Sequence, residues 1–321
     1  AVMKGFQGAG LFSFLAEKLL KKANSARKLM FVLVYLPFFM SMLVTNDVSL
    51  ITFVPFAITA LKAAGQERLV VPLVILQTLA ANLGSMLTPM GNPQNLYLYG
   101  ASGIGFGGLM LTMLPYTAVS AIGLFIAIMC FKSVPVGEIE EQTELGGPFR
   151  LTWPAVGFAV CILCLFDIIP PLIIAAVMLV FLLFADRKAL AKVDYSLLIT
   201  FIALFIFIGN MGNIESFRNF INSVISGNEA MVAVLASQVI SNVPAALLLS
   251  GFSTNWSALI VGCNIGGLGT LIASMASLIS YKAIAKDYPE RRPKYLLVFT
   301  LLNIAFLAVL IGLYFLLQWL A

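Results

Sequence analysis

The stretch Asn82-Leu-Gly-Ser-Met-Leu-Thr-Pro-Met-Gly-Asn-Pro-Gln-Asn95 lies inside an apolar run that extends over residues 70–99. Its two glycines and two prolines interrupt a regular helix, because proline lacks a backbone donor and clashes with the preceding turn. Irregular backbone at membrane depth is tolerated only where it is buried in protein or lines a cavity. The stretch therefore predicts a broken transmembrane helix over 70–99 that contributes to a polar site.

The composition around this stretch is that of a membrane protein. Hydrophobic residues make up 61% of the chain and charged residues only 10%, whereas a soluble domain has about 25% charged residues. The apolar runs are continuous, as in transmembrane helices, and do not alternate as in barrel strands. We therefore predict an all-α polytopic protein of the inner or plasma membrane, with helices over 109–131, 151–166, 172–185, 195–208 and 295–320.

The net charge of +5 reflects basic clusters between the apolar runs. The positive-inside rule places these clusters in the cytoplasm, which explains the charge without a nucleic-acid partner. The 29–61 segment between two clusters is too short for two full crossings at about 20 residues each. It therefore predicts a re-entrant hairpin with Thr45, Asn46 and Asp47 at its tip. A second hairpin is predicted over 230–253, with Ser241 and Asn242 at its tip, opening to the exterior.

The two hairpins belong to a predicted inverted repeat, formed by residues 1–150 and 151–321. Asn82-Leu-Gly84 aligns with Asn264-Ile-Gly266, and 91–95 then aligns with 273–277 without a gap. This alignment predicts a second broken helix over 256–281, a pattern typical of secondary transporters. Nothing in the first half matches the helices of 151–208. We therefore expect about three further helices before Ala1, at ~20 residues each; the alternative is an asymmetric fold.

Polar residues and glycines at the helix breaks and hairpin tips are the predicted ligands of substrate and ion. Freed N–H groups and half-helix N-termini suit an anion, and freed carbonyls suit a cation. A Gly/Ser-rich face for helix packing is the alternative reading of each broken helix. The predicted set comprises Thr45, Asn46, Asp47, Asn82, Thr88, Gly91, Asn92, Pro93, Asn95, Ser241, Asn242, Asn264, Gly266, Thr270, Ser274 and Ser277.

Asp47 is the one acidic residue that this topology buries in the membrane. Intramembrane carboxylates are costly and are therefore functional by default, so Asp47 is a predicted Na⁺ ligand together with Asn46 and Asn242, or a proton carrier. The alternative is that Asp47 caps the second helix of the hairpin.

Enzymatic chemistry lacks its usual groups in this chain. There is no histidine, and no second buried acid pairs with Asp47. The four cysteines lie in apolar segments, where free cysteine behaves as a small hydrophobe. We expect no enzyme activity and no cofactor other than a coupling ion, Na⁺ or H⁺.

The hairpin tips, the Gly91-Asn-Pro-Gln-Asn95 motif and the 264–277 segment together resemble the ion transporter superfamily. This superfamily includes arsenite permeases, related Na⁺/H⁺ antiporters, citrate transporters and divalent-anion/sodium symporters. The resemblance implies a scaffold domain that dimerises and a transport domain that slides as an elevator. In the dicarboxylate symporters both tips read Ser-Asn-Thr. Here Asp47 and Val243 hold the third positions, and an acid at this point resembles the arsenite-permease and antiporter branches.

The sequence thus predicts an ion-coupled secondary transporter that moves a small inorganic or organic anion by alternating access. Its expected partners are that anion, the bilayer and a second copy of the chain. Two alternatives remain at this point: a Na⁺/H⁺ antiporter in which Asp47 alternately holds the two cations, and an arsenite-type efflux permease. A passive channel fits less well, because hairpins that open to opposite sides suit alternating gates.

Overall fold

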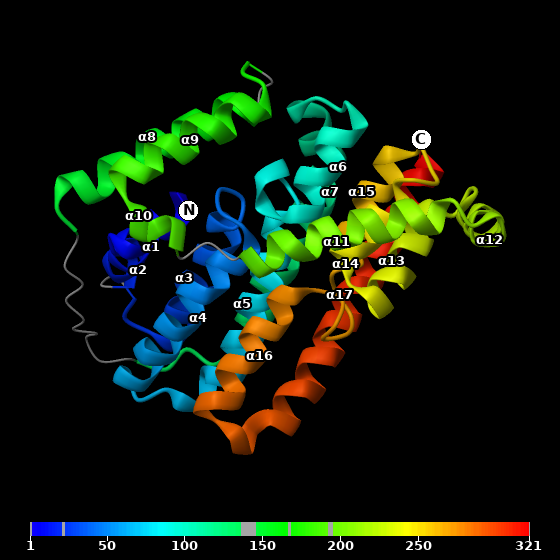
Figure 1. Ribbon diagram of the computed structural model, residues 1–321. Helices are drawn as coiled ribbons and strands as arrows, with labels where there is room; N and C mark the ends of the chain where they lie inside the picture. The colour runs from blue at the N-terminus through cyan, green and yellow to red at the C-terminus, as the bar shows by residue number, and fades with distance from the viewer. Residues whose placement is uncertain (1, 21–22, 136–145, 166–167, 192–194, 321) are drawn as a thin grey trace. The chain divides into compact units, whose positions relative to one another are not determined.

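The computed structural model describes residues 2–20, 23–135, 146–165, 168–191 and 195–320 (Figure 1). These ranges are helical apart from turns, loops and one isolated bridge between Ser25 and Pro135, so the prediction of an all-helical protein is confirmed. The chain divides into two compact units. The first comprises Ala1–Lys22 and Glu138–Phe201, and the second comprises Ala23–Gly137 and Ile202–Ala321. Each unit therefore takes segments from both predicted repeats.

The first unit is built on the contact between its N-terminal helix and α8. Its buried core contains Val2, Trp153, Ile174, Met178 and Leu182. A Cβ atom on Gly5 would lie 2.3 Å from the Trp153 ring, so the small residue allows α1 to pack against α8. Its helices are α1 (Val2–Gly8), α2 (Leu11–Leu20), α8 (Pro148–Leu165), α9 (Pro171–Ala185), α10 (Arg187–Ala191) and the start of α11 (Tyr195–Gly212).

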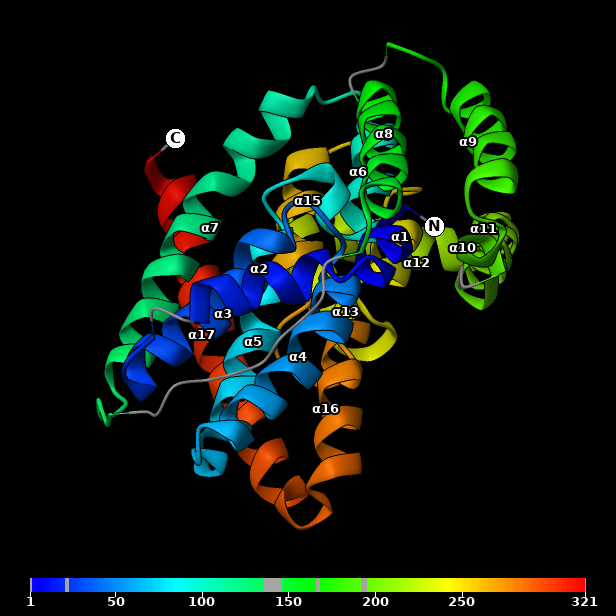
Figure 2. The ribbon, with the colours of Figure 1, turned by 90° about the vertical axis from the view of Figure 1, so that its left-hand side faces the viewer.

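The second unit is arranged around α5 (Val70–Ser85). Every residue of α5 except Pro72 is buried, and the helix contacts α3, α4, α7, α16 and α17. Figures 1 and 2 both show α3, α4 and α5 side by side, with α16 next to α4. Its other helices are α3 (Ala26–Met40), α4 (Asn46–Ala63), η1 (Glu67–Leu69), η2 (Pro89–Gly91), α6 (Pro93–Ser102), α7 (Phe106–Met129), α12 (Glu215–Ile225), α13 (Glu229–Ile240), α14 (Asn242–Leu249), α15 (Trp256–Ile265), α16 (Met275–Asp287), η3 (Pro289–Arg291) and α17 (Arg292–Leu320).

Two helical hairpins occupy the segments in which hairpins are predicted. In the first, α3 and α4 are joined by residues 41–45, and the Thr45 hydroxyl caps α4 by accepting a hydrogen bond from the Val48 N–H. In the second, Ser241 alone separates α13 from α14. Ser241 has φ 73° and ψ 153°, and it is the one non-glycine residue with positive φ in the described ranges. Both hairpins therefore place an asparagine, Asn46 or Asn242, at the first position of their second helix.

Two helices are broken near their middle. The first break separates α5 from α6, where Asn92 is extended at φ −154° between η2 and Pro93. The second separates α15 from α16 over residues 266–274. Glycine is required at the first break, since a Cβ on Gly91 would lie 2.0 Å from the Ser85 carbonyl oxygen. Both breaks carry buried polar side chains, Asn92 at the first and Ser274 at the second.

Three helices in the described ranges are individually long and apolar enough to cross a membrane: Glu67–Ser85, Phe106–Met129 and Pro289–Leu320. A bent pair, Glu215–Ile225 with Glu229–Ile240, turns by 119°. The short helices α1, α2 and α12 were not predicted from the sequence.

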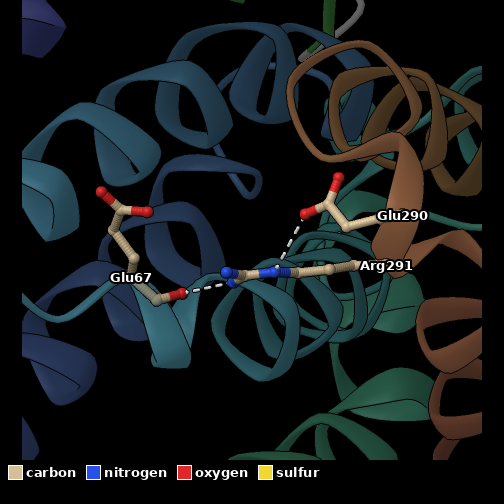
Figure 3. A network of polar contacts seen from close by, with 3 residues as sticks. All are labelled: Glu67, Glu290 and Arg291. Carbon is tan, nitrogen blue, oxygen red and sulfur yellow. Dashed lines mark hydrogen bonds and ion pairs between the residues drawn. The ribbon is translucent and has the colours of Figure 1, made fainter.

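A polar contact fastens the turn after α4 to the turn after α16 (Figure 3). Arg291 donates a hydrogen bond of 2.8 Å to the Glu67 carbonyl oxygen and forms a 3.3 Å ion pair with Glu290. Lys62 and the Arg291 guanidinium also lie 5.1 Å and 4.7 Å from the centre of the Tyr288 ring. We call these groups the α4–α16 clasp.

Candidate functional site

The first part of the candidate site joins the tip of hairpin one to the break between α15 and α16 through Asn82. Asn46 Nδ2 donates a 3.0 Å hydrogen bond to Asn82 Oδ1, and the Ser274 hydroxyl donates one of 3.1 Å to the same oxygen. All three side chains are buried. Asn82, near the end of α5, thus binds residues from a hairpin and from the start of α16.

The second part joins the two helix breaks directly. Asn92 Nδ2 donates a 3.1 Å hydrogen bond to Asn264 Oδ1, and Asn264 Nδ2 donates in turn to Asn95 Oδ1. Asn92 also donates to the Ser85 hydroxyl at 3.2 Å. Asn264 belongs to α15, Asn92 directly precedes α6 and Asn95 lies in the first turn of α6, and all three are buried.

The tip of hairpin two reaches the same region through the backbone. The Asn242 N–H donates a 2.9 Å hydrogen bond to the Ala273 carbonyl oxygen, and the Ser241 hydroxyl donates to that oxygen at 3.3 Å. The Asn242 amide also closely approaches Gly267, where an added Cβ would lie 2.7 Å from Nδ2. Because Ala273 precedes Ser274, the two hairpin tips are linked through one chain of contacts.

Two threonines fix the backbone at the breaks. The Thr88 hydroxyl donates to the Met42 carbonyl oxygen, and the Thr270 hydroxyl donates to the Gln238 carbonyl oxygen at 3.2 Å. Gln238 adds three contacts with its side chain: Oε1 accepts from the Thr270 N–H at 2.9 Å, and Nε2 donates to the carbonyls of Gly266 and Leu268, each at 2.9 Å. Gln238 and Ser85 are absent from the predicted set.

Asp47 lies in the first turn of α4, where the positive end of the helix dipole stabilises a carboxylate. Its N–H donates to Asn46 Oδ1 at 2.9 Å, and its side chain is half-buried. At the N-cap position of α4 the side-chain cap is supplied by Thr45.

The remaining predicted residues serve mainly to shape the breaks. Pro93 occupies the first turn of α6, and a Cβ on Gly266 would lie 2.8 Å from the Ser237 hydroxyl oxygen. Ser277 lies in the first turn of α16 with no hydrogen-bond partner for its buried hydroxyl.

The assembled groups are amides, hydroxyls and backbone dipoles, which we call the central network. Within the described ranges no three His, Cys, Asp or Glu side chains cluster as a metal site would require. Such uncharged donors and acceptors can replace the hydration shell of a small ion.

Apolar helices, two helical hairpins and two helix breaks around a buried polar network are the features of a multi-pass membrane transporter. The chain belongs to the citrate transporter family, whose model matches residues 1–255.

Two relatives are similar over most of the chain. An uncharacterized transporter of Methanocaldococcus jannaschii is 33% identical over 304 residues, covering 93% of this chain and 82% of the relative. The inner membrane protein YbiR of Escherichia coli is 30% identical, covering 87% of this chain and 76% of its own. A silicon efflux transporter of Oryza sativa is 28% identical over 44% of this chain and 29% of its own length. The family and these relatives identify an ion-coupled permease of the anion-transporter type and not an enzyme.

Proposed function

We propose that this transporter moves a small anion, coupled to Na⁺ or H⁺, through a site in the central network. The observation that carries the proposal is the pair of hydrogen bonds between the helix breaks, from Asn92 to Asn264 and from Ser274 to Asn82. Broken helices expose backbone dipoles, and they persist in membranes where they bind substrates and ions. The polar groups of both breaks therefore form one site.

An inverted repeat is part of this proposal, and the pairing of the bonds supports it. One constant shift in residue number relates Asn82 to Asn264 and Asn92 to Ser274, so each bond between the breaks is the counterpart of the other. The two threonine bonds follow the same rule, since Thr88 and Thr270 each donate to a carbonyl just before a hairpin tip. A repeat of this kind allows one half to take the conformation of the other, which is how alternating access arises.

The division into two units supports an elevator mechanism. Both hairpins, both broken helices and the central network lie in the second unit, whereas α1, α2, α8 and α9 lie in the first. We assign the second unit as the moving transport domain and the first as scaffold, and we propose that a homodimer forms in the inner or plasma membrane.

The coupling ion has a candidate site at the tips. Asp47 supplies a carboxylate, and Asn46 and Asn242 lie on the two ends of the contact chain through Asn82 and Ser274. Na⁺ prefers such oxygen-rich surroundings. A Na⁺/H⁺ antiporter using Asp47 alone is the second candidate, and the name of the silicon efflux relative keeps an efflux permease as a third.

Uptake in proteoliposomes tests these functions. Arsenite, phosphate, sulfate, dicarboxylates and citrate are offered in turn, while Na⁺ and pH gradients are varied separately. We expect uptake of at least one anion that depends on one gradient, and loss of that dependence in Asp47→Asn. If adding Na⁺ collapses an imposed pH gradient while no anion is transported, the protein is instead the antiporter.

A further inference from the structure

An open pocket lies at the open end of hairpin two, apart from the central network. It has a volume of about 800 Å³, and its walls come from the end of α11, from α12 and from the segment 250–255 that joins α14 to α15. This joining segment follows α14, so it lies at the end of the hairpin opposite the tip at Ser241. In the re-entrant hairpin that the sequence predicts, this end is at the membrane surface.

Helix α12 has one polar and one apolar face. Arg218 and Asn222, one turn apart on the polar face, line the pocket. Phe217 packs edge-on against Phe252 of the joining segment, with ring centres 6.1 Å apart, whereas Phe220, on the side opposite Arg218, is 62% exposed. The chain bends by 119° between α12 and α13 (Figure 1). An amphipathic helix of this kind lies along a membrane surface with its apolar face toward the acyl chains.

The electrostatics of the pocket favour an anionic group. Arg218 is the one charged side chain among the described residues that line it. Trp256 also lines the pocket and is the first residue of α15, so the positive end of this 10-residue helix dipole lies there too. The acids that flank α12 and α13, Glu215 and Glu229, do not belong to the lining.

The neutral polar residues of the pocket suit a hydroxylated group. Asn213, Ser253 and Thr254 offer an amide and two hydroxyls. Ser253 Oγ accepts a 3.1 Å hydrogen bond from the Asn255 N–H, and its hydroxyl proton can still be donated. A zwitterionic head group would place its ammonium among these groups with no carboxylate to pair with, whereas a glycerol head group can form hydrogen bonds with them.

We propose that this pocket binds the head group of an anionic phospholipid of the phosphatidylglycerol type. Arg218 and Asn222 hold the phosphate, in part through charge-assisted hydrogen bonds, and Phe220 contacts the acyl chains. Trp256 fits this location, because tryptophan is enriched where the membrane meets water. The lipid site is separate from the central network and does not depend on which substrate is transported.

Thermal unfolding of the purified protein in a neutral detergent tests the proposal. Phosphatidylglycerol, phosphatidylcholine with the same acyl chains and soluble glycerol phosphate are added in separate titrations. We expect phosphatidylglycerol to raise the unfolding temperature far more than the other two. In Arg218→Gln the apparent Kd for phosphatidylglycerol should rise about tenfold, which corresponds to about 1.4 kcal/mol. Arg68→Gln removes an exposed arginine outside the pocket and should leave this Kd unchanged.

Asn222→Ala and Asn219→Ala form a second matched pair, which keeps the test available if the Arg218 variant does not fold. Both side chains are exposed on α12, but only Asn222 lines the pocket. We expect the apparent Kd to rise severalfold in Asn222→Ala and to stay unchanged in Asn219→Ala. An unchanged Kd in Arg218→Gln, or an equal rise in Arg68→Gln, would overturn the inference. Equal stabilisation by phosphatidylcholine or by glycerol phosphate would also overturn it, because the pocket would then not select an anionic lipid.

Discussion

At the tip of hairpin two, Ser241 has a strained backbone conformation and its neighbour Asn242 contacts the central network. Ser241 lies in a backbone region that is almost exclusive to glycine and costs of order 1–3 kcal/mol for other residues. It is held there because its neighbour Asn242 binds the Ala273 carbonyl. Strain that the surrounding contacts maintain is common at ligand clamps and switch regions.

Replacing Ser241 with glycine should therefore stabilise the protein by about 1 kcal/mol, because glycine adopts this conformation without strain. Ser241→Ala retains the strain and loses the weak 3.3 Å hydroxyl contact, so it serves as the control. Apparent unfolding temperatures in detergent measure both effects. An alanine variant more stable than the glycine variant would show that Ser241 is not strained.

Many residues of the central network are among those named from the sequence, and their role as ligands stays a prediction. Asn46, Asn82, Asn92 and Asn264 are predicted because they lie at hairpin tips and helix breaks, and the structure joins Asn46 to Asn82 and Asn92 to Asn264. Gln238 was missed because it binds carbonyls of an irregular loop, whose path the sequence does not specify. The signal was available, since Gln238 is a polar residue three positions before a tip.

At the scale of elements, helix breaks and hairpins follow from local chemistry. Proline and glycine within apolar runs mark where α5 and α15 end, because they disrupt regular helix hydrogen bonding. The helices α2 and α12 carry no such signal: α2 has only 10 residues, and α12 has 11, about half of them polar. Which element packs against which also could not be predicted: α4 contacts α16, and α14 contacts α6.

The contribution of the α4–α16 clasp to stability can be tested by replacing Arg291. Arg291→Ala removes the bond to the Glu67 carbonyl and the contact with the Tyr288 ring, and should destabilise the protein by about 1 kcal/mol, as is typical of partly exposed cation–π and hydrogen-bond contacts. Glu290→Ala removes only an exposed ion pair and should change stability little. Equal unfolding temperatures for wild type and Arg291→Ala would show that the clasp contributes nothing.

At the scale of the whole molecule, composition and charge predicted the class of protein. Apolar runs and basic clusters indicate a multi-pass membrane protein, which agrees with the three long apolar helices and with the citrate transporter family. The segments that form each of the two units could not be predicted from local pattern, because each unit joins segments that are distant in sequence. Such long-range packing depends on side-chain complementarity and not on local pattern.

The central claim is that both helix breaks form one transport site, and a double-mutant cycle on uptake tests it most directly. Asn92→Ala, Asn264→Ala and the double variant are compared in proteoliposomes, with Asn303→Ala as a matched buried asparagine outside the network. We predict that each single change lowers uptake at least about tenfold, that the double variant loses no more than Asn264→Ala alone, and that Asn303→Ala transports normally, because residues in one contact are not additive. Full uptake in both single variants, or losses that multiply as for independent sites, would contradict the claim.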